Sequence, residues 1–330
     1  MLCRTASDLY WVSRHMERAE NTARLVDLAL RIAMLPERYD RGKAQAAPWR
    51  RALDALGAGG EYLEAQGAIE ADGVLRHLLL SPDNPSSIHS CLRAARENAR
   101  AQRVAITAEM YEDLNASWLE IRSRTWAGVR SDGISNIVEW VKSRSASFRG
   151  VTIGTLGRGE AYQFLQLGAF IERADWAIRL LDVVGSDGEI DESGEARDAA
   201  DYFQWSALLQ SQSAFETYRR LYRESITPRS VTDLMLLREV NPRSLQTCLN
   251  TLHEVLRAMT GGESLEVVRL AGALSAQSRY ARIEEIIGRG LEPHLQDTMA
   301  RLVDLGEAIH DQFMVSLDAG QGQAQAQAAA

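Results

Sequence analysis

The sequence is poor in the residues that mark several common classes of protein. Only three cysteines, Cys3, Cys91 and Cys248, occur among its 330 residues, with no Cys-x-x-Cys pair and no clustering with histidine. This pattern indicates neither a disulfide framework nor a zinc site, and it favours a reducing compartment, so we expect a cytoplasmic protein. Only seven prolines are present, so long helices are easily accommodated.

Charge and hydropathy exclude further classes. The net charge is −8 and no basic face is evident, whereas non-specific binding to nucleic acid requires one to displace counterions from phosphates. No apolar run approaches the roughly 20 residues that cross a bilayer. The N-terminus also lacks a basic segment followed by an apolar block. We therefore expect no nucleic-acid partner, no membrane partner and no signal peptide.

What is present is helical periodicity almost throughout, because no segment alternates with period two between turn signals. We therefore expect an all-α multi-helix bundle. The expected helices cover residues 6–33, 48–67, 71–80, 86–127, 133–147, 159–184, 198–223, 230–238, 243–260, 264–288 and 291–318.

Three stretches interrupt this pattern. FRGVTIGTLGRG (148–159) is rich in glycine but matches neither GxGxxG nor GxxxxGK[ST] and follows no strand, so we interpret it as a connector and not as a phosphate loop. GSDGEIDESGEARD (185–198) is acidic, and we expect a mobile loop. The tail over 320–330 lacks core-forming residues, and we expect it to be disordered.

Several landmarks recur at offsets of 155 to 157 residues. NPSSIHSCL (84–92) matches NPRSLQTCL (241–249), and VLRHLLL (74–80) matches VTDLMLL (231–237). The most specific shared element is Asn-Pro-x-Ser before an apolar helix, where proline can start the helix and serine can cap it. We therefore predict two tandem homologous helical repeats over residues 1–150 and 151–319, the second packed on the first as one domain.

The strongest recurrence is a helix that carries charge inside an apolar pattern. SRHMERAENTARLVD (13–27) and AFIERADWAIRLLD (169–182) both keep an apolar stripe at spacings of three and four, and both also carry apolar residues on the opposite side. Neighbouring elements usually enclose such helices, and a buried ion needs a counter-charge. We predict the local pairs Glu20 to Arg24 and Asp175 to Arg179. We further predict that Glu17 meets Arg173 and that Glu172 meets Arg18.

Two interpretations of these charges remain open: a buried ion-pair network that fixes helix register, or a polar pocket whose arginines bind carboxylate or phosphate groups. Direct acid–base catalysis by Glu17 or Glu172 is a further alternative, although the sequence fixes no nucleophile or histidine beside them. The candidate binding residues are Arg14, Glu17, Arg18, Glu20, Arg24, Asp27, Glu172, Arg173, Asp175, Arg179 and Asp182.

A di-metal carboxylate site would need two Glu-x-x-His motifs and two further glutamates on facing helices. The sequence offers one such motif, Glu307 to His310. We therefore expect no metal site and no cofactor. Cys91 and Cys248 occupy matching positions, and we interpret them as small residues of the core.

The charged segments resemble the alpha-E family, an all-helical family named for its Glu-Arg pair, here Glu17-Arg18 and Glu172-Arg173. TASDLYWVSRHMERAENTARLVD is similar to the N-terminal signature of that family, TIGTLGRGEAYQFLQLGAFIERADWAIRLLD to its mid-chain signature, and ITAEMYEDLN (106–115) to a third block. The resemblance covers roughly residues 2–318. Two positions depart from it: Ala169 follows Gly168 where the family has arginine, and Tyr111 replaces a usual tryptophan.

The resemblance implies a setting in bacterial gene clusters. Alpha-E proteins accompany circularly permuted ATP-grasp ligases, and often transglutaminase-like peptidases, in systems that form amide bonds. We therefore expect a helical partner or scaffold that binds the ligase, or its peptide or amino-acid substrate, through a Glu/Arg-lined pocket between the repeats. The alternative is an enzyme that acts on carboxylate or peptide substrates with the Glu/Arg cluster as its active site.

Overall fold

The computed structural model describes residues 1–35, 46–185 and 199–315. These residues form sixteen helices and no strand, so the predicted all-α fold is confirmed for this part of the chain. The helices of the first part are α1 (Cys3–Ala33), α3 (Ala47–Ala55), α4 (Gly59–Gln66), α5 (Ala71–Leu80), α6 (Ile88–Ala101), α7 (Ala108–Ser123), α8 (Trp126–Asp132) and α9 (Ile134–Thr155). They are followed by α10 (Glu160–Gly185), α11 (Ala199–Ser211), α12 (Phe215–Leu221), α13 (Pro228–Leu236), α14 (Leu245–Met259), α15 (Glu266–Tyr280), α16 (Ile283–Arg289) and α17 (Leu291–Phe313).

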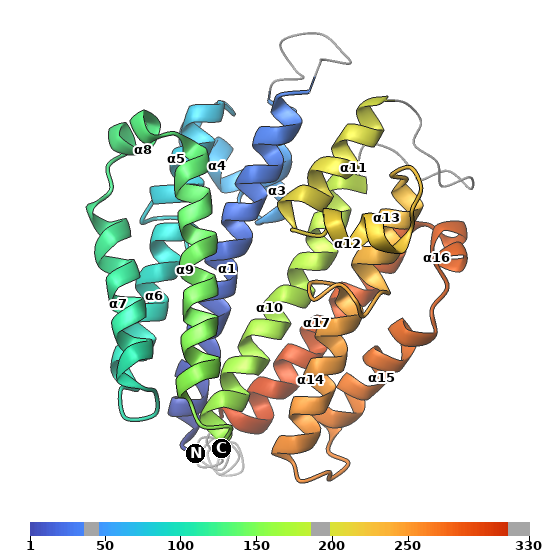
Figure 1. The fold of residues 1–330 in the computed structure, drawn as a ribbon. Coiled ribbons are helices and arrows are strands. Elements are labelled where there is room, and N and C mark those ends of the chain that lie inside the picture. The colour runs from blue at the N-terminus through green and yellow to red at the C-terminus, as the bar shows by residue number, and fades with distance from the viewer. Residues whose placement is uncertain (36–45, 186–198, 316–330) are drawn as a thin grey trace, which may run out of the picture.

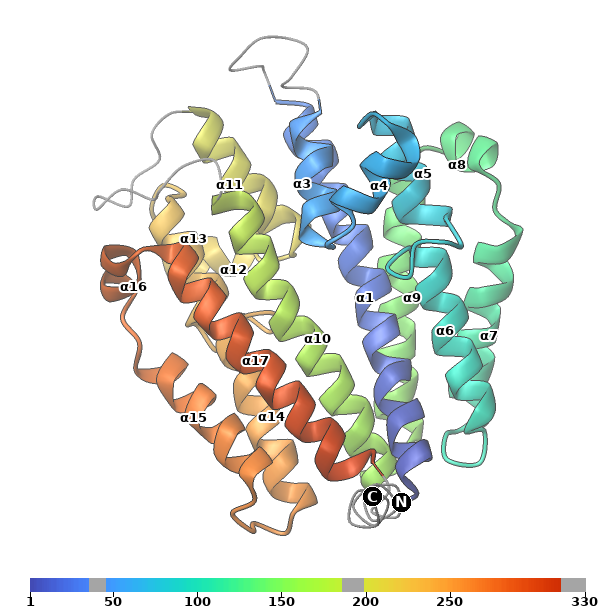
Figure 2. The same cartoon turned by 180° about the vertical axis from the view of Figure 1, so that it is seen from behind.

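The two charged segments lie on α1 and α10, which run side by side through the middle of the molecule in both views (Figures 1 and 2). Helices α6 and α9 pack on α1, and α14 and α17 pack on α10. Gly168 allows α10 to approach the backbone of α1 closely, because a Cβ atom there would overlap the Tyr10 carbonyl oxygen and the Ser13 hydroxyl. The apolar stripe of α1 is buried from Leu9 to Val26, as predicted.

The Asn-Pro-x-Ser signals start helices as predicted. The Ser87 and Ser244 side chains accept hydrogen bonds from the backbone N–H groups at Ser90 and Thr247, at 3.1 and 3.2 Å, and so cap α6 and α14. Asn241 also holds the turn before α14, because its amide oxygen accepts a hydrogen bond from the Arg243 backbone N–H at 3.1 Å. This turn aims the residue after the proline toward α1.

Several predicted boundaries were wrong. The helix expected over 86–127 is divided into α6, α7 and the start of the short α8, because Thr107 and Thr125 cap new helices. The helices expected over 48–67 and 198–223 are each divided at a positive φ, 68° at Gly57 and 55° at Ser213. The helix expected over 264–288 is divided between α15 and α16.

The connector predicted over 148–159 was also wrong for most of its length, since α9 continues to Thr155. Phe148 and Thr152 are buried at a spacing of four residues, and this packing outweighs the low helix propensity of the glycines. The boundary that we expected after residue 150 therefore falls inside a helix. The acidic stretch 186–198 and the tail 320–330 lie outside the described residues.

The described helices share one continuous apolar core that extends across both halves of the chain. No helix in the described ranges has the length and apolarity to cross a membrane.

Candidate functional site

The two reciprocal ion pairs predicted between α1 and α10 are present. Arg18 donates to Glu172 through Nε at 2.6 Å and through Nη2 at 2.9 Å. Arg173 donates to Glu17 in the same two-pronged manner, with its Nε 3.2 Å from Oε2. Such paired contacts fix the planes of both groups as well as their separation. The adjacent glutamate and arginine of each central helix therefore bind the arginine and glutamate of the other helix.

Arg14 adds a second cation to Glu172. Its Nε and Nη2 both lie 2.9 Å from Glu172 Oε2. Its guanidinium carbon lies 4.8 Å from the centre of the Trp11 ring and 5.6 Å from that of Tyr10, in cation–π geometry. Nη1 also donates a long hydrogen bond, 3.5 Å, to the Tyr10 hydroxyl. Arg14 is thus fixed by Glu172 and by the two aromatic rings of α1.

Two further arginines reach the site, and the sequence reasoning missed both. Arg149 of α9 donates to Glu17 at 3.1 Å and also to Glu20. Arg243, two residues after Asn241, donates to Glu20 and lies 3.9 Å from Glu17 Oε2. Its place in the Asn-Pro-Arg-Ser signal was the one clue in the sequence, whereas Arg149 lay in the presumed connector.

Arg24 and Arg179 form the predicted local pairs and also reach across to other helices. Arg24 binds Glu20 at 2.8 and 3.0 Å, and its Nη1 donates to the Ser211 carbonyl, the last of α11, at 2.6 Å. Arg179 binds Asp175 at 2.6 and 3.1 Å, and its Nη1 donates to the Ala55 carbonyl, the last of α3, at 3.2 Å. The last carbonyls of a helix carry partial negative charge, so each arginine stabilises a helix end.

Two predicted residues, Asp27 and Asp182, take part in none of these ion pairs. Asp27 pairs with Arg31 at 3.0 Å, one turn further along α1. Asp182 is exposed near the end of α10. The surrounding protein still partly desolvates its carboxyl group, and this desolvation, followed by the charge of Glu292, raises the pKa of Asp182.

We call the buried part the arginine–glutamate network. Its carboxylates are Glu17, Glu20 and Glu172, and its cations are Arg14, Arg18, Arg24, Arg149, Arg173 and Arg243. Six cations face three carboxylates, so the centre of an acidic protein has a surplus of three positive charges. The Ser211 carbonyl offsets part of it at Arg24.

The network stays ionised despite its burial. Burial alone would raise the pKa of Glu172, but Arg18 and Arg14 hold it below its usual range. Burial would likewise raise the pKa of Glu17, and Arg173 is the main cause of its net lowering. Arg243 shows the surplus of cations, because burial, Arg24 and Arg173 together lower its pKa to about 10. Every one of these groups therefore remains charged at neutral pH.

No reactive thiol accompanies the network. Cys91 and Cys248 are fully buried, and burial raises the pKa of each thiol to about 12. A thiol with such a pKa is protonated and unreactive at neutral pH. The interpretation of these cysteines as core residues agrees with their burial.

A cavity of about 490 Å³ opens beside the network between α1, α10 and α17, and we call it the Trp11 pocket. Its lining includes Tyr10, Trp11, Arg14, Asp175, Glu307 and His310. Two of the predicted binding residues, Arg14 and Asp175, thus border a cavity, together with the Glu-x-x-His turn of α17. Within the described ranges, no three acidic, histidine or cysteine side chains are grouped so as to hold a metal ion.

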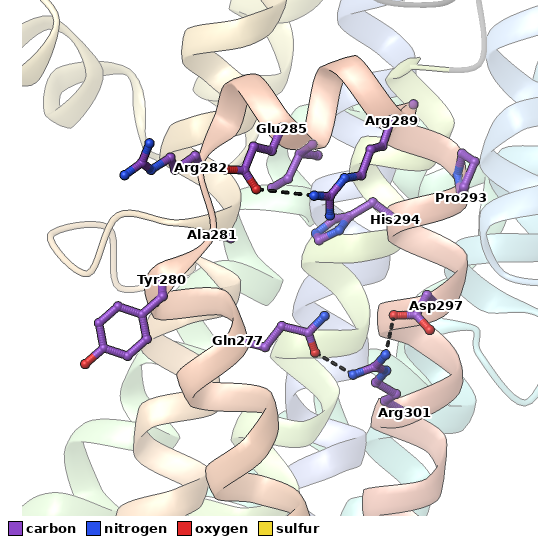
Figure 3. A pocket seen from close by; sticks show the side chains of 12 residues that line it. Gln277, Tyr280, Ala281, Arg282, Glu285, Arg289, Pro293, His294, Asp297 and Arg301 are labelled. Atoms are coloured by element: carbon purple, nitrogen blue, oxygen red, sulfur yellow. Dashed lines mark hydrogen bonds and ion pairs between the residues drawn. The ribbon is translucent and has the colours of Figure 1, made fainter.

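A second cavity of about 510 Å³ lies between α15, α16 and α17, and Figure 3 shows its lining. None of the predicted binding residues takes part in it. Arg289 pairs there with Glu285 at 3.5 Å, and Arg301 pairs with Asp297 at 3.1 Å and with Gln277 at 2.5 Å. Its charges are therefore largely paired among exposed residues, which makes it a weaker candidate than the Trp11 pocket.

Comparisons with known proteins place the chain among helical domains. The Alpha-E family model, described as a predicted alpha-helical domain with a conserved ER motif, matches residues 1–314. The chain is 26% identical over 321 residues to an uncharacterized protein of Mycobacterium bovis, Mb2597, and this match covers 90% of the chain and 35% of that protein. It is 25% identical over 321 residues to the uncharacterized protein Rv2567 of Mycobacterium tuberculosis, with the same coverage. The chain thus spans about a third of the length of these relatives. No solved structure matches it.

Proposed function

Because the chain belongs to the Alpha-E family, we propose that it is a non-catalytic helical partner of an ATP-grasp ligase that forms amide bonds. The protein binds the ligase, or presents its peptide or amino-acid substrate in the Trp11 pocket. The partners that we propose are a circularly permuted ATP-grasp ligase and a transglutaminase-like peptidase, in the bacterial cytoplasm.

The observation that carries the non-catalytic assignment is the closure of the arginine–glutamate network. Glu172 accepts from both Arg14 and Arg18, and its side chain is only 5% exposed. General acid–base catalysis needs a group that exchanges a proton near the working pH and reaches the substrate. The buried glutamates have lowered pKa values and are enclosed by arginines, which supports a structural role.

The geometry of the Trp11 pocket supports the binding role. Arg14 joins the pocket to the network, because it lines the cavity and also binds Glu172. A cavity wall that is already fixed loses little conformational entropy when a ligand binds. The closed network would therefore serve the function by holding α1 and α10 in one register beneath the pocket.

The length of the relatives supports a role beside other domains. The matched region is 35% of each mycobacterial protein, so this helical unit is joined there to further sequence. A domain that adjoins others in its relatives fits a partner better than a self-contained enzyme.

We also infer that the two halves arose by duplication. Both α9 and α17 follow a glycine with positive φ, 94° at Gly133 and 95° at Gly290. The cross-helix caps are reciprocal as well, since Arg24 of α1 binds the end of α11 and Arg179 of α10 binds the end of α3. Crossed contacts of this kind are what packing about an internal pseudo-twofold axis produces.

The competing function is an enzyme for carboxylate or peptide substrates with the network as its active site. The surplus of three positive charges favours it, because a bound carboxylate or phosphate would neutralise part of the surplus. An enzyme of this kind would turn over substrate without a ligase.

The experiment that separates the two is reconstitution with the proposed circularly permuted ATP-grasp ligase. Co-purification of the two proteins, and faster amide-bond formation when this chain is added, are expected for a partner. The chain alone should release no product and no ADP. Turnover by the isolated chain would establish the enzyme, and a ligase that neither binds the chain nor responds to it would refute the partnership.

A further inference from the structure

The Trp11 pocket has charged walls, and its two half-buried charged residues, Arg14 and Asp175, already form ion pairs. Arg14 is bound to Glu172 through two nitrogen atoms at 2.9 Å, and its third points to Tyr10. Asp175 is held through both oxygens by Arg179, at 2.6 and 3.1 Å. Both groups are therefore already engaged in ion pairs, with Glu172 shared between Arg14 and Arg18. A ligand carboxylate that sought Arg14 would have to compete with Glu172, which is built into the site.

The α17 wall carries charge that nothing neutralises. Glu307 and Asp311 both line the pocket, and neither has an ion pair within the part of the chain that the structure describes. They are four residues apart on one helix face, where like charges repel by about 0.2 to 0.5 kcal/mol. These two exposed carboxylates give the α17 wall of the cavity a charge of −2, which favours a cationic ligand on that side.

The remaining lining is aromatic and apolar. Trp11 stands on the α1 side, and Ile171, Met299 and Leu302 supply aliphatic surface. An aromatic ring beside carboxylates is a common way to bind an ammonium group, and the aliphatic surface suits an apolar side chain next to it.

A buried hydroxyl in the pocket lining adds a hydrogen-bond donor. Tyr10 lines the pocket and is only 4% exposed. Its oxygen accepts the long hydrogen bond from Arg14, but within the described residues its own proton has no acceptor. Buried hydroxyl protons are normally bonded, so this proton is available to an acceptor such as the carbonyl of a ligand.

We propose that the Trp11 pocket binds a primary ammonium group next to an apolar side chain and a carbonyl, as in the N-terminal residue of a peptide. The ammonium lies against Glu307 and Asp311, the side chain against the aliphatic surface, and the carbonyl accepts from Tyr10. This inference rests on the proposed function and deepens it, because the amine is the group that an amide-forming ligase acylates.

Gly306 provides a clean way to block the pocket. It lines the cavity, and a Cβ atom at this position meets nothing within 4 Å. A phenylalanine side chain there would enter the pocket without straining the α17 backbone. Gly150 of α9 is the matched control, since it is an exposed helical glycine that also has open space around its Cβ position.

The experiment is a calorimetric titration of the full chain at pH 7 with L-leucinamide, N-acetyl-L-leucinamide, N-acetyl-L-leucine and Nα-acetyl-L-lysinamide. We expect L-leucinamide to bind and the three acetylated compounds to bind at least about tenfold more weakly. Glu307→Gln and Asp311→Asn should each weaken the binding of L-leucinamide about fivefold. Gly306→Phe should abolish it, and Gly150→Phe should leave it unchanged.

The outcomes that would overturn the proposal are specific. Equal binding of N-acetyl-L-leucine would mean that the pocket recognises a carboxylate, and equal binding of Nα-acetyl-L-lysinamide would mean that a lysine side chain suffices. Binding that survives Gly306→Phe would place the ligand elsewhere. If L-leucinamide fails to bind while the chain still binds and stimulates the ligase, only the amine assignment fails. If L-leucinamide binds and the ligase does not, the proposed partnership fails.

Discussion

The sharpest test of the arginine–glutamate network is Glu172→Gln. The substitution keeps the volume of the side chain but removes the negative charge that holds Arg14 and Arg18, whose side chains are 19% and 24% exposed. Breaking a buried pair by removing one partner costs about 3 to 5 kcal/mol. Because both arginines keep partial contact with water, we expect about 3 kcal/mol, the lower end of this range.

The assay is urea unfolding followed by circular dichroism, with Asp27→Asn as the matched control. Asp27 pairs with Arg31, which is 40% exposed, so the control should lose less than about 1 kcal/mol. Adding Arg18→Met to Glu172→Gln should restore at least about 1 kcal/mol, because it removes a cation that has lost its partner. A Glu172→Gln variant within about 0.5 kcal/mol of the control would refute the reasoning that the network is closed and buried.

The pH dependence of the same variant has a defined sign. The pKa of Glu172 is lowered in the folded protein, so its contribution is complete above the unfolded pKa of about 4.3 and is lost as the pH falls through the folded pKa. The stability difference between wild type and Glu172→Gln should therefore be constant near neutral pH and shrink below about pH 4.

Three further predictions follow from single residues. Gly168→Ala should cost at least about 3 kcal/mol, since its Cβ would overlap the backbone of α1, whereas Gly306→Ala should gain about 0.5 to 1 kcal/mol by urea unfolding. Burial and the charge of Arg18 lower the pKa of His15 to about 4, so stability should fall by at most about 3 kcal/mol as the pH drops from 6.5 to 4, and His15→Gln should lack this step. In native thiol titration only Cys3 should react promptly, because the other two cysteines are buried.

The sequence predicted the ion pairs between α1 and α10 and the ion pair within α1. Glu17 to Arg173 and Glu172 to Arg18 follow from the same residues at the same place on two helices that share one seam. The local pair of Glu20 and Arg24 follows from helical spacing alone. The all-α class was equally accessible, because helical periodicity needs no tertiary information.

The contacts that the sequence did not predict are made by helices that only the tertiary structure brings together. Arg243 reaches Glu20 because the Asn241 turn directs it there. The sequence alone does not reveal that these two residues lie close together. Arg149 was missed because glycines suggested a connector, while the burial of Phe148 keeps α9 helical past it. Breaks such as that at Ser213 depend on a single backbone angle, which periodicity does not encode.

The duplication that we propose relates the position of the Trp11 pocket to an asymmetry in the network. Arg149 and Gly306 each lie fifteen residues after the first residue of their helices, α9 and α17. On α9 the arginine fills this position and gives Glu17 its second cation. On α17 the position has no side chain, so Glu172 takes its second cation from Arg14 of α1 instead. The space that a side chain at 306 would occupy is thereby left open beside Arg14, which explains why a cavity forms here next to a network that is otherwise closed.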